Sequence, residues 1–293
     1  MNTVGPARPG RAAASPTAHR GGPLQRKRLL VCGKGGSGKS TLVALFAAVL
    51  EEKGYQVMVL DGDASNPEGL VRLLFGVGEA EEPRPLVEFF GGIRRVTCPV
   101  DDPSPLTRVG DPDPLPQKPI NLAHEVDPEY YLAKGGLRFL QAGKIETYGQ
   151  GCDGPLEKVV RDFIVGDDVV SLIDEKAGVE HFGRRIPDRM DVVLGVLDCT
   201  RESVSIARRM SKFAMAMRNR NVWFVLNKVE SAAMAARMLE LLGELSTRVI
   251  GQVPYVPQLA QAALAGTPLD QSLAAAHVVP IVERLESLAS DAA

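Results

Sequence analysis

One stretch of the chain carries residue types and spacing suited to binding a polyphosphate. It reads Gly33-Lys34-Gly35-Gly36-Ser37-Gly38-Lys39-Ser40-Thr41 and matches the pattern G-x-x-x-x-G-K-[ST] from Gly33 to Ser40. Glycines in such a loop let successive backbone N–H groups converge on phosphate oxygens, and a following helix adds the positive end of its dipole. Lys39 is expected to reach the β- and γ-phosphates, and Ser40 to hold Mg²⁺. The stretch therefore predicts a nucleotide-binding loop rather than an accidental glycine-rich turn.

Carboxylates elsewhere in the chain could serve the same nucleotide. Asp61 and Asp63 follow one apolar run, and Asp174 ends another. Carboxylates at the C-terminal ends of parallel strands lie where ligands bind, so we predict that Asp174 binds Mg²⁺ through water and that Asp61 and Asp63 serve the metal and the attacking water. The alternative for Asp61 and Asp63 is a solvated turn closed by an aspartate side chain. Gly178 could present its N–H to a γ-phosphate and so distinguish ATP from ADP.

The elements that must position these residues alternate between strand and helix. Apolar runs predict strands, and amphipathic periodicity between them predicts helices. The predicted strands are residues 29–32, 55–60, 136–142, 168–173, 191–197, 221–226 and 249–253, and the predicted helices are residues 42–52, 156–164, 202–217, 231–242, 256–265 and 270–289. This alternation predicts a three-layer α/β fold, in which helices cover both faces of a mostly parallel sheet.

Two segments fall outside the alternation. Residues 1–26 are rich in Gly, Pro, Ala and Arg and contain no apolar run, so they are predicted to be a disordered basic tail. Residues 76–120 contain many prolines, which break any long helix, and are predicted to be an insertion or a lid rather than a second domain. Residues 27–290 are therefore expected to form a single P-loop domain.

Composition restricts the classes of partner. Six of the 34 Lys and Arg residues precede Leu29, where the chain has no acidic residue, so the remainder carries 28 basic against 36 acidic residues. An acidic body disfavours a large nucleic-acid surface, and no apolar run is long enough to predict a membrane span. The cysteines lack paired spacing, which favours a reducing cytoplasm over a disulfide framework; they are Cys32, Cys98, Cys152 and Cys199.

Two sequence motifs resemble a known group of ATPases. The extra lysine, Lys34, makes the phosphate loop similar to the deviant Walker A motif of the group that contains MinD, ParA and the nitrogenase iron protein. The run Asp174-Glu175-Lys176-Ala177-Gly178-Val179-Glu180-His181-Phe182-Gly183-Arg184 resembles switch II of the CooC-type ATPases, which mature nickel-containing carbon monoxide dehydrogenase. The segment from Gly143-Lys144-Ile145 to Gly151-Cys152 also looks like theirs. The resemblance extends over about residues 28–285 in motif order.

The resemblance implies catalytic roles for individual residues. ATP would lie between the two subunits of a homodimer, and Lys34 would reach the nucleotide of the partner subunit. Asp63 would position the hydrolytic water, while Asp61 would lie near Mg²⁺ together with Ser40 and Asp174. The expected activity is slow, Mg²⁺-dependent ATP hydrolysis coupled to a conformational change of the dimer.

The same resemblance implies a site for the base. Asn227 matches the asparagine that reads the adenine edge, and Pro254-Tyr255-Val256 resembles the loop that packs along the base. The guanine-specific pattern Asn-Lys-x-Asp is absent because Glu230 stands in the last position. ATP is therefore favoured over GTP.

The cysteine pattern departs from that of the CooC-type proteins. They carry Cys-x-Cys, and two copies across the dimer bind nickel or zinc, whereas this chain has Cys152-Asp153-Gly154 and lacks the second thiol. Two copies of Cys152 on a two-fold axis could still supply two soft ligands for Ni²⁺ or Zn²⁺. The alternative is that Cys152 is a small buried residue or an interface thiol. His181 is expected to be a structural group of switch II rather than a metal ligand.

Three functions remain open from the sequence. The first is a dimeric ATPase that delivers metal to a metalloenzyme client or activates it. The second is a positioning or partition ATPase of the MinD or ParA kind, although residues 278–287 do not form the basic amphipathic end that anionic lipid would require. The third is an electron-transfer ATPase like the nitrogenase iron protein, which needs two cysteines per subunit for an iron–sulfur cluster. Cys152 could supply one, and Cys98 or Cys199 would have to supply the other.

Overall fold

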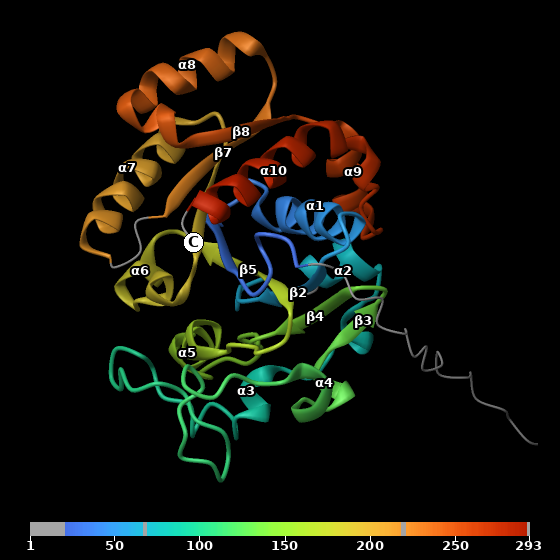
Figure 1. The fold of residues 1–293 in the computed structure, drawn as a ribbon, viewed down its shortest axis with the longest axis vertical. Helices are drawn as coiled ribbons and strands as arrows, with labels where there is room; N and C mark the ends of the chain where they lie inside the picture. The colour runs from blue at the N-terminus through green and yellow to red at the C-terminus, as the bar shows by residue number, and fades with distance from the viewer. Residues whose placement is uncertain (1–20, 67–68, 218–220, 292–293) are drawn as a thin grey trace, which may run out of the picture.

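A computed structural model describes residues 21–66, 69–217 and 221–291 (Figure 1). The strands are β1 (Arg28–Gly33), β2 (Gln56–Asp61), β3 (Leu132–Lys134), β4 (Leu137–Gln141), β5 (Val169–Ala177), β6 (Val192–Leu197), β7 (Val222–Val229) and β8 (Val249–Pro254). The α-helices are α1 (Lys39–Glu52), α2 (Gly69–Phe75), α3 (Leu86–Phe89), α4 (Leu122–Glu125), α5 (Gly154–Asp162), α6 (Glu180–Gly183), α7 (Arg201–Ala216), α8 (Ala232–Leu242), α9 (Pro257–Ala265) and α10 (Ala275–Asp291). Short 3-10 helices are η1 (Glu79–Glu81), η2 (Pro128–Tyr130), η3 (Ile186–Arg189), η4 (Gly243–Arg248) and η5 (Gln271–Leu273).

The described strands form one eight-stranded sheet in the order β3-β4-β2-β5-β1-β6-β7-β8. Neighbouring strands are parallel throughout, except that β3 runs antiparallel to β4 at one edge. Because parallel strands all end at the same edge, β1, β2 and β5 bring their C-terminal residues together near the centre of the sheet. The predicted α/β fold with a mostly parallel sheet is confirmed.

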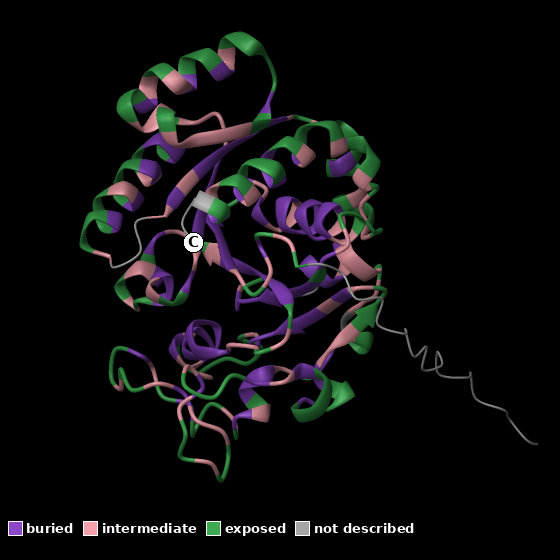
Figure 2. Ribbon diagram, viewed as in Figure 1, coloured by how far each residue is buried: buried purple, intermediate pink, exposed green. Residues whose placement is uncertain are grey.

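The sheet is buried on both faces, as an apolar parallel sheet must be. Successive side chains of β1 point to opposite faces. Leu29 and Val31 pack in one core with α1, α2, α9 and α10, whereas Leu30 and Cys32 pack in the other with α5, α7 and α8. Figure 2 shows the strands and α1 as the buried centre and the outer helices with one exposed side.

The Pro-rich segment from residue 76 to residue 120 forms part of the second core. Leu86, Phe90, Leu106 and Leu115 are all buried among the residues of that core. The Phe90 ring meets Phe163 edge to face, with ring centroids 6.3 Å apart. In Figure 1 the segment lies beneath α5. The segment therefore helps to cover this face of the sheet, and its role as an insertion or a lid stays a prediction.

Several predicted boundaries differ from those in the structure. Leu24 is fully buried, so the fold begins before residue 27, while residues 1–20 of the predicted tail lie outside the described residues. Strands β5 and β7 continue past their predicted ends, which places Asp174 and Asn227 inside strands rather than after them. The helix α2 and the edge strand β3 were not predicted; both are short, and periodicity is a weak signal over so few residues.

Candidate nucleotide-binding site

The predicted phosphate loop lies between β1 and the N-terminus of α1. Gly36 and Gly38 have left-handed φ angles of 74° and 91°. A Cβ on Gly38 would lie 2.4 Å from Nδ2 of Asn227, so the loop needs glycine there. The first turn of α1 has no side-chain cap and no acidic residue. Its backbone N–H groups are therefore available to donate hydrogen bonds to an anion such as phosphate. Lys39 is buried, and its Nζ donates to the carbonyl oxygen of Lys34 at 3.4 Å.

Two buried carboxylates lie side by side next to this loop. The register of β2 and β5 pairs Asp61 with Asp174, and Oδ1 of Asp174 has no hydrogen-bond partner among the described residues. Burial and then the charge of Asp61 raise the pKa of Asp174 to about 7, although a hydrogen bond from Ser40 and the charge of Lys39 lower it. An unpartnered carboxylate oxygen beside a hydroxyl and a second carboxylate fits Mg²⁺, which prefers oxygen ligands. These residues are therefore suited to hold the predicted ion.

A buried lysine that the sequence did not assign to the site holds the first carboxylate. Lys144 Nζ donates to Oδ2 of Asp61 and to the backbone oxygen of Asp63, each at 2.7 Å. The side chains of Lys144 and Asp61 are only 7% and 5% exposed. Asp63 itself is half-buried, and its Oδ1 accepts from the backbone N–H and the hydroxyl of Ser65 at 3.0 and 2.6 Å. Lys144 thus fixes the turn that carries both predicted aspartates.

The extra lysine of the loop is engaged within its own chain. Lys34 Nζ lies 2.9 Å from Oδ2 of Asp198 and 3.7 Å from Oε2 of Glu202, and it donates to Oγ1 of Thr200 at 3.4 Å. The hydrogen bond to Asp198 raises the pKa of Lys34. All three partners lie at the junction between β6 and α7. In this arrangement, Lys34 is tied to its own subunit by a polar cluster that the sequence did not predict.

The backbone N–H of Gly178 is also engaged. It donates to the carbonyl oxygen of Gly33 at 3.1 Å, and Gly178 has a left-handed φ of 106°. The predicted contact with a γ-phosphate would require this N–H to leave Gly33. Gly178, which is predicted to belong to switch II, is thus attached to the phosphate loop in this structure.

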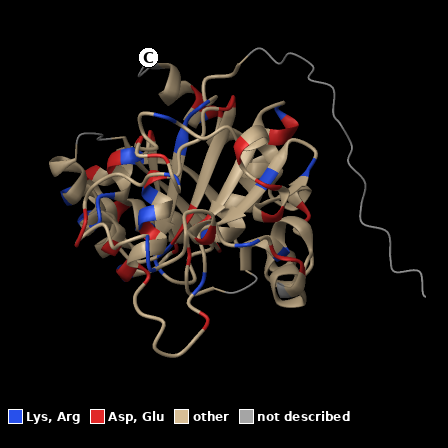
Figure 3. Cartoon of the chain, turned by 90° about the horizontal axis from the view of Figure 1, so that it is seen from below, with Lys and Arg blue, Asp and Glu red and all other residues tan. Residues whose placement is uncertain are grey.

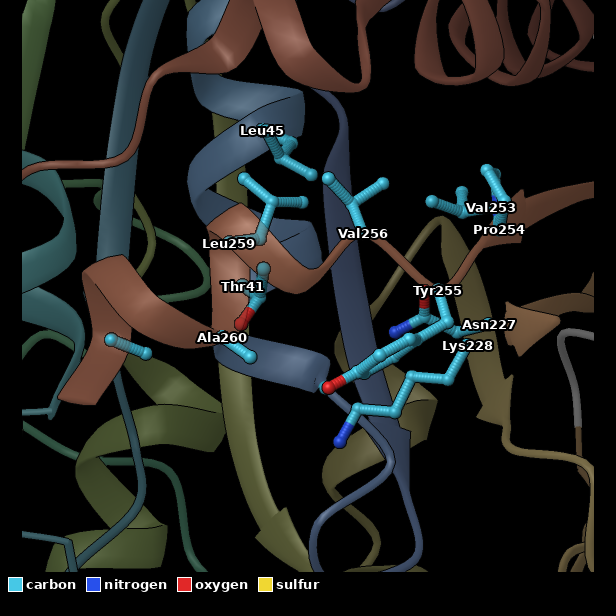
Figure 4. Close-up of a pocket in the computed structure, with 12 residues that line it drawn as sticks. Thr41, Leu45, Asn227, Lys228, Val253, Pro254, Tyr255, Val256, Leu259 and Ala260 are labelled. Atoms are coloured by element: carbon cyan, nitrogen blue, oxygen red, sulfur yellow. The ribbon is translucent and has the colours of Figure 1, made fainter. Parts of the chain in front are cut away.

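A pocket beside the N-terminal half of α1 gathers the residues predicted to hold the base (Figure 4). Its volume is about 250 Å³. Asn227 lines the pocket on the side of the phosphate loop, where its Nδ2 donates to the carbonyl oxygen of Ser37 at 2.8 Å and Lys228 donates to that of Gly36 at 2.7 Å. The remaining lining is mostly apolar and comes from α1, β8, the loop after β8, and α9: Thr41, Leu45, Val253, Pro254, Tyr255, Val256, Leu259, Ala260 and Ala263. An apolar slot with an amide at one end is suited to a planar heterocycle.

Comparison with known proteins identifies the family. The profile of the CobQ/CobB/MinD/ParA nucleotide-binding domain matches residues 29–269. The chain belongs to this family. An uncharacterized ATP-binding protein of Methanocaldococcus jannaschii is 28% identical over 262 residues, which cover 88% of this chain and 99% of the relative. The carbon monoxide dehydrogenase accessory protein CooC of Rhodospirillum rubrum is 24% identical over 272 residues, which cover 88% and 97% of the two chains.

Solved structures of the family share the fold. The septum site-determining protein MinD of Pyrococcus horikoshii, complexed with Mg-ADP, gives a TM-score of 0.61 at 15% identity, over 91% of this chain and 99% of that one. MinD of Aquifex aeolicus gives 0.58 at 20% identity, over 89% and 97%. Family membership makes the chain a nucleotide-binding protein, and the geometry makes the edge of the sheet around Gly33–Thr41 the candidate site.

Other predicted features lie outside this site. Cys152 is exposed, and no group of three or more His, Cys, Asp or Glu in the described ranges could hold a metal ion. His181 is buried without a hydrogen bond to either ring nitrogen, and burial lowers its pKa to about 3, so it packs as a neutral ring against Phe182.

Acidic and basic residues are interspersed in the view of Figure 3. No helix in the described part of the chain is long and apolar enough to cross a bilayer.

Proposed function

We propose that the chain is a Mg²⁺-dependent ATPase that works as a homodimeric switch and delivers metal to a metalloenzyme client or activates it. The observation that carries the ATPase part is the unpartnered Oδ1 of Asp174 beside Ser40 and the open N-terminus of α1. Mg²⁺ would supply charge neutralisation for the β- and γ-phosphates. The chain itself would bind phosphate through the loop and Lys39, and position a water through Asp63.

The pocket supports adenine as the base. Asn227 uses Nδ2 to bind Ser37, and its Oδ1 accepts no hydrogen bond from the described residues. That oxygen could accept from the exocyclic amino group of adenine, whereas guanine would present a carbonyl oxygen to it. Pro254 and Val256 would pack on the faces of the ring. The site therefore favours ATP over GTP.

The role of Asp63 is tested by its alanine variant. Asp63→Ala is expected to lower ATP turnover by about 100-fold, because the water loses its positioning group, and to leave the Kd for a non-hydrolysable ATP analogue within about threefold. Turnover and binding would be measured on the same sample, with Asp101→Ala, at an exposed aspartate in the Pro-rich insertion, as the control. Wild-type turnover in Asp63→Ala would remove this residue from the mechanism.

The homodimer proposal rests on Lys34. In the proposed closed dimer, Lys34 leaves Asp198 and reaches the nucleotide of the partner subunit. Lys34→Ala is therefore expected to keep ATP binding while reducing ATP-dependent dimerisation and turnover by about tenfold or more, since a trans cation at the transferring phosphate is lost. Dimer formation would be followed by light scattering with ATP and with ADP, and Lys212→Ala on exposed α7 is the matched control. Unchanged dimerisation would mean that the loop works within one subunit.

The proposed client follows from the likeness to CooC, an accessory protein of carbon monoxide dehydrogenase. That likeness extends over 88% of this chain. An ATPase that opens and closes around bound ATP could pass a metal ion to a client as its conformation changes. Co-purification of the metal-free client, strengthened by ATP and weakened in Lys34→Ala, is the expected result. A client that matures equally well without this chain would contradict the proposed role.

A further inference from the structure

The backbone of Asp63 is held at both of its polar groups by one buried ion pair. Its N–H donates to Oδ1 of Asp61 at 3.0 Å, and its carbonyl oxygen accepts from Nζ of Lys144 at 2.7 Å. The same Nζ donates to Oδ2 of Asp61 at 2.7 Å, so the three residues form a closed ring of hydrogen bonds. The side chains of Asp61 and Lys144 are almost fully buried. Any displacement of the Asp63 backbone would therefore break a bond of this ring.

The turn from Gly62 to Ala64 is anchored on either side of the ring as well. The N–H of Gly62 donates to the carbonyl oxygen of Asp174 at 2.8 Å, and the N–H of Ile145 donates to that of Ala64 at 3.0 Å. Backbone bonds thus hold the turn at its first and last residues, and Lys144 supplies a side-chain donor between them.

The carboxylates around this turn differ in the oxygens that they leave free. Both oxygens of Asp61 are engaged, one by a backbone N–H and the other by an ammonium group. That ammonium group, 2.7 Å from Oδ2 of Asp61, would also repel a second cation placed there. Asp63 binds Ser65 through Oδ1, and no hydrogen bond within the described ranges engages its Oδ2. The oxygens available to a water or an ion therefore belong to Asp63 and Asp174.

We propose that Lys144 and Asp61 are positioning residues for ATP hydrolysis and that Asp61 is not a ligand of the metal ion. The pair fixes the backbone of Asp63, and Asp63 places the attacking water with its free oxygen. Asp174 and Ser40 remain the residues that would hold the ion. This assignment rests on the proposed ATPase function and gives Lys144 a role in it.

Stability alone is a weak reason to bury this ion pair. Removing two charges from water is costly, and a pair of well-packed apolar side chains is often at least as stable. Precise placement is a stronger reason, because displacing a reacting group by about 1 Å can lower a rate about 100-fold. Since both polar backbone groups of Asp63 end on this pair, the residue that is placed is Asp63.

The test uses the full chain with Lys144→Met and Asp61→Asn combined. This double variant removes both buried charges together, so it is expected to fold. Asparagine keeps an oxygen for the N–H of Asp63, so the hold that is lost is the donor to the Asp63 carbonyl oxygen.

Two quantities separate positioning from metal binding. One is kcat for ATP at saturating Mg²⁺, which is expected to fall about tenfold in the double variant because Asp63 is no longer held in place. The other is the Kd for Mn²⁺ with ADP bound, followed from the electron paramagnetic resonance of free Mn²⁺, which is expected to stay within about threefold. Lys118→Met with Asp111→Asn removes an exposed ion pair of similar length and should change neither quantity.

A further comparison shows whether the pair acts through Asp63. Added to Asp63→Ala, the double variant should lower kcat no further than Asp63→Ala does alone, since the group that the pair positions is already gone. A general structural defect would instead lower kcat by the same factor whether or not Asp63 is present.

Three results would overturn the assignment. A wild-type kcat in the double variant would leave the pair no part in the reaction, and equal losses with and without Asp63 would make its role structural. A Kd for Mn²⁺ raised about tenfold or more would make Asp61 a metal ligand. Each of these results leaves the proposed ATPase intact, whereas a wild-type chain that does not hydrolyse ATP with Mg²⁺ would refute the proposed function itself.

Discussion

Replacing Lys144 with methionine is expected to destabilise the protein by about 3–5 kcal/mol, because a buried carboxylate loses its counter-charge. Lys144 and Asp61 are 7% and 5% exposed, and their charged atoms lie 2.7 Å apart. Methionine keeps the length of the side chain but supplies no donor, so Asp61 is left beside Asp174 with no cation bound to it. Urea unfolding at neutral pH measures the effect as a shift in midpoint at constant slope.

Two further variants show whether the effect comes from the unpaired charge. Lys144→Met with Asp61→Asn removes both charges and should recover most of the lost stability, as expected when the cost lies in an uncompensated ion. Lys118→Met breaks an ion pair of similar length, 2.6 Å to Asp111, but Lys118 is 52% exposed, so solvent screens the pair and the urea midpoint should hardly move. A double variant no more stable than Lys144→Met would mean that packing, not charge, makes Lys144 necessary.

The parts of the site that the sequence predicted are those encoded locally. The loop from Gly33 to Thr41 is a continuous pattern, and its glycines are required where the backbone is left-handed or crowded. The positions of Asp61 and Asp174 followed from apolar runs, because parallel strands end at one edge of a sheet. Neither prediction needed any knowledge of contacts between distant residues.

The contacts that the sequence did not predict join residues far apart in the chain. Lys144 meets Asp61 over a separation of 83 residues, and Asn227 meets Ser37 over 190. Lys34 turns to Asp198 and Thr200 at the start of α7, which depends on how β6 and α7 pack beside the loop. No periodicity or motif encodes these pairings, since each is set by the order of strands in the sheet.

The Pro-rich insertion shows the same limit for the fold. Its prolines correctly excluded a long helix, but they carry no information about which face of the sheet the segment covers. Burial of Leu86, Phe90 and Leu115 fixes that position. The same packing brings Cys98, which had no visible partner in the sequence, against Gly154 at the start of α5.

Asp174→Asn is expected to lower Mg²⁺-dependent turnover by about 100-fold or more. The same substitution is expected to stabilise the nucleotide-free protein at pH 8. Burial, and then the charge of Asp61, raise the pKa of Asp174 from 3.8 to about 7. Between pH 3.8 and about 7, the folded state therefore keeps a proton that the unfolded state has lost. Stability linked to this group is complete below the unfolded pKa and falls as pH rises through about 7. The shift corresponds to roughly 4 kcal/mol of folding stability that the wild type loses between low pH and pH 8. The Asp174→Asn protein does not lose it, because asparagine does not ionise.

The measurement is the urea midpoint of both proteins at pH 5 and pH 8, with and without Mg-ADP. At pH 5 the folded wild type still holds the proton but has already lost part of the linked stability, so Asp174→Asn should have a small advantage there and a larger one at pH 8. Mg-ADP should reverse that order, because the ionised carboxylate of the wild type helps bind the metal and binding stabilises the folded state. Asp113→Asn, at an exposed aspartate, should change neither result. Suppose instead that Asp174→Asn is less stable than the wild type at pH 8 without nucleotide. The charge of the Asp174 carboxylate would then already be stabilised by other groups in the free protein. Its unpartnered oxygen would no longer argue for a metal ion at this site.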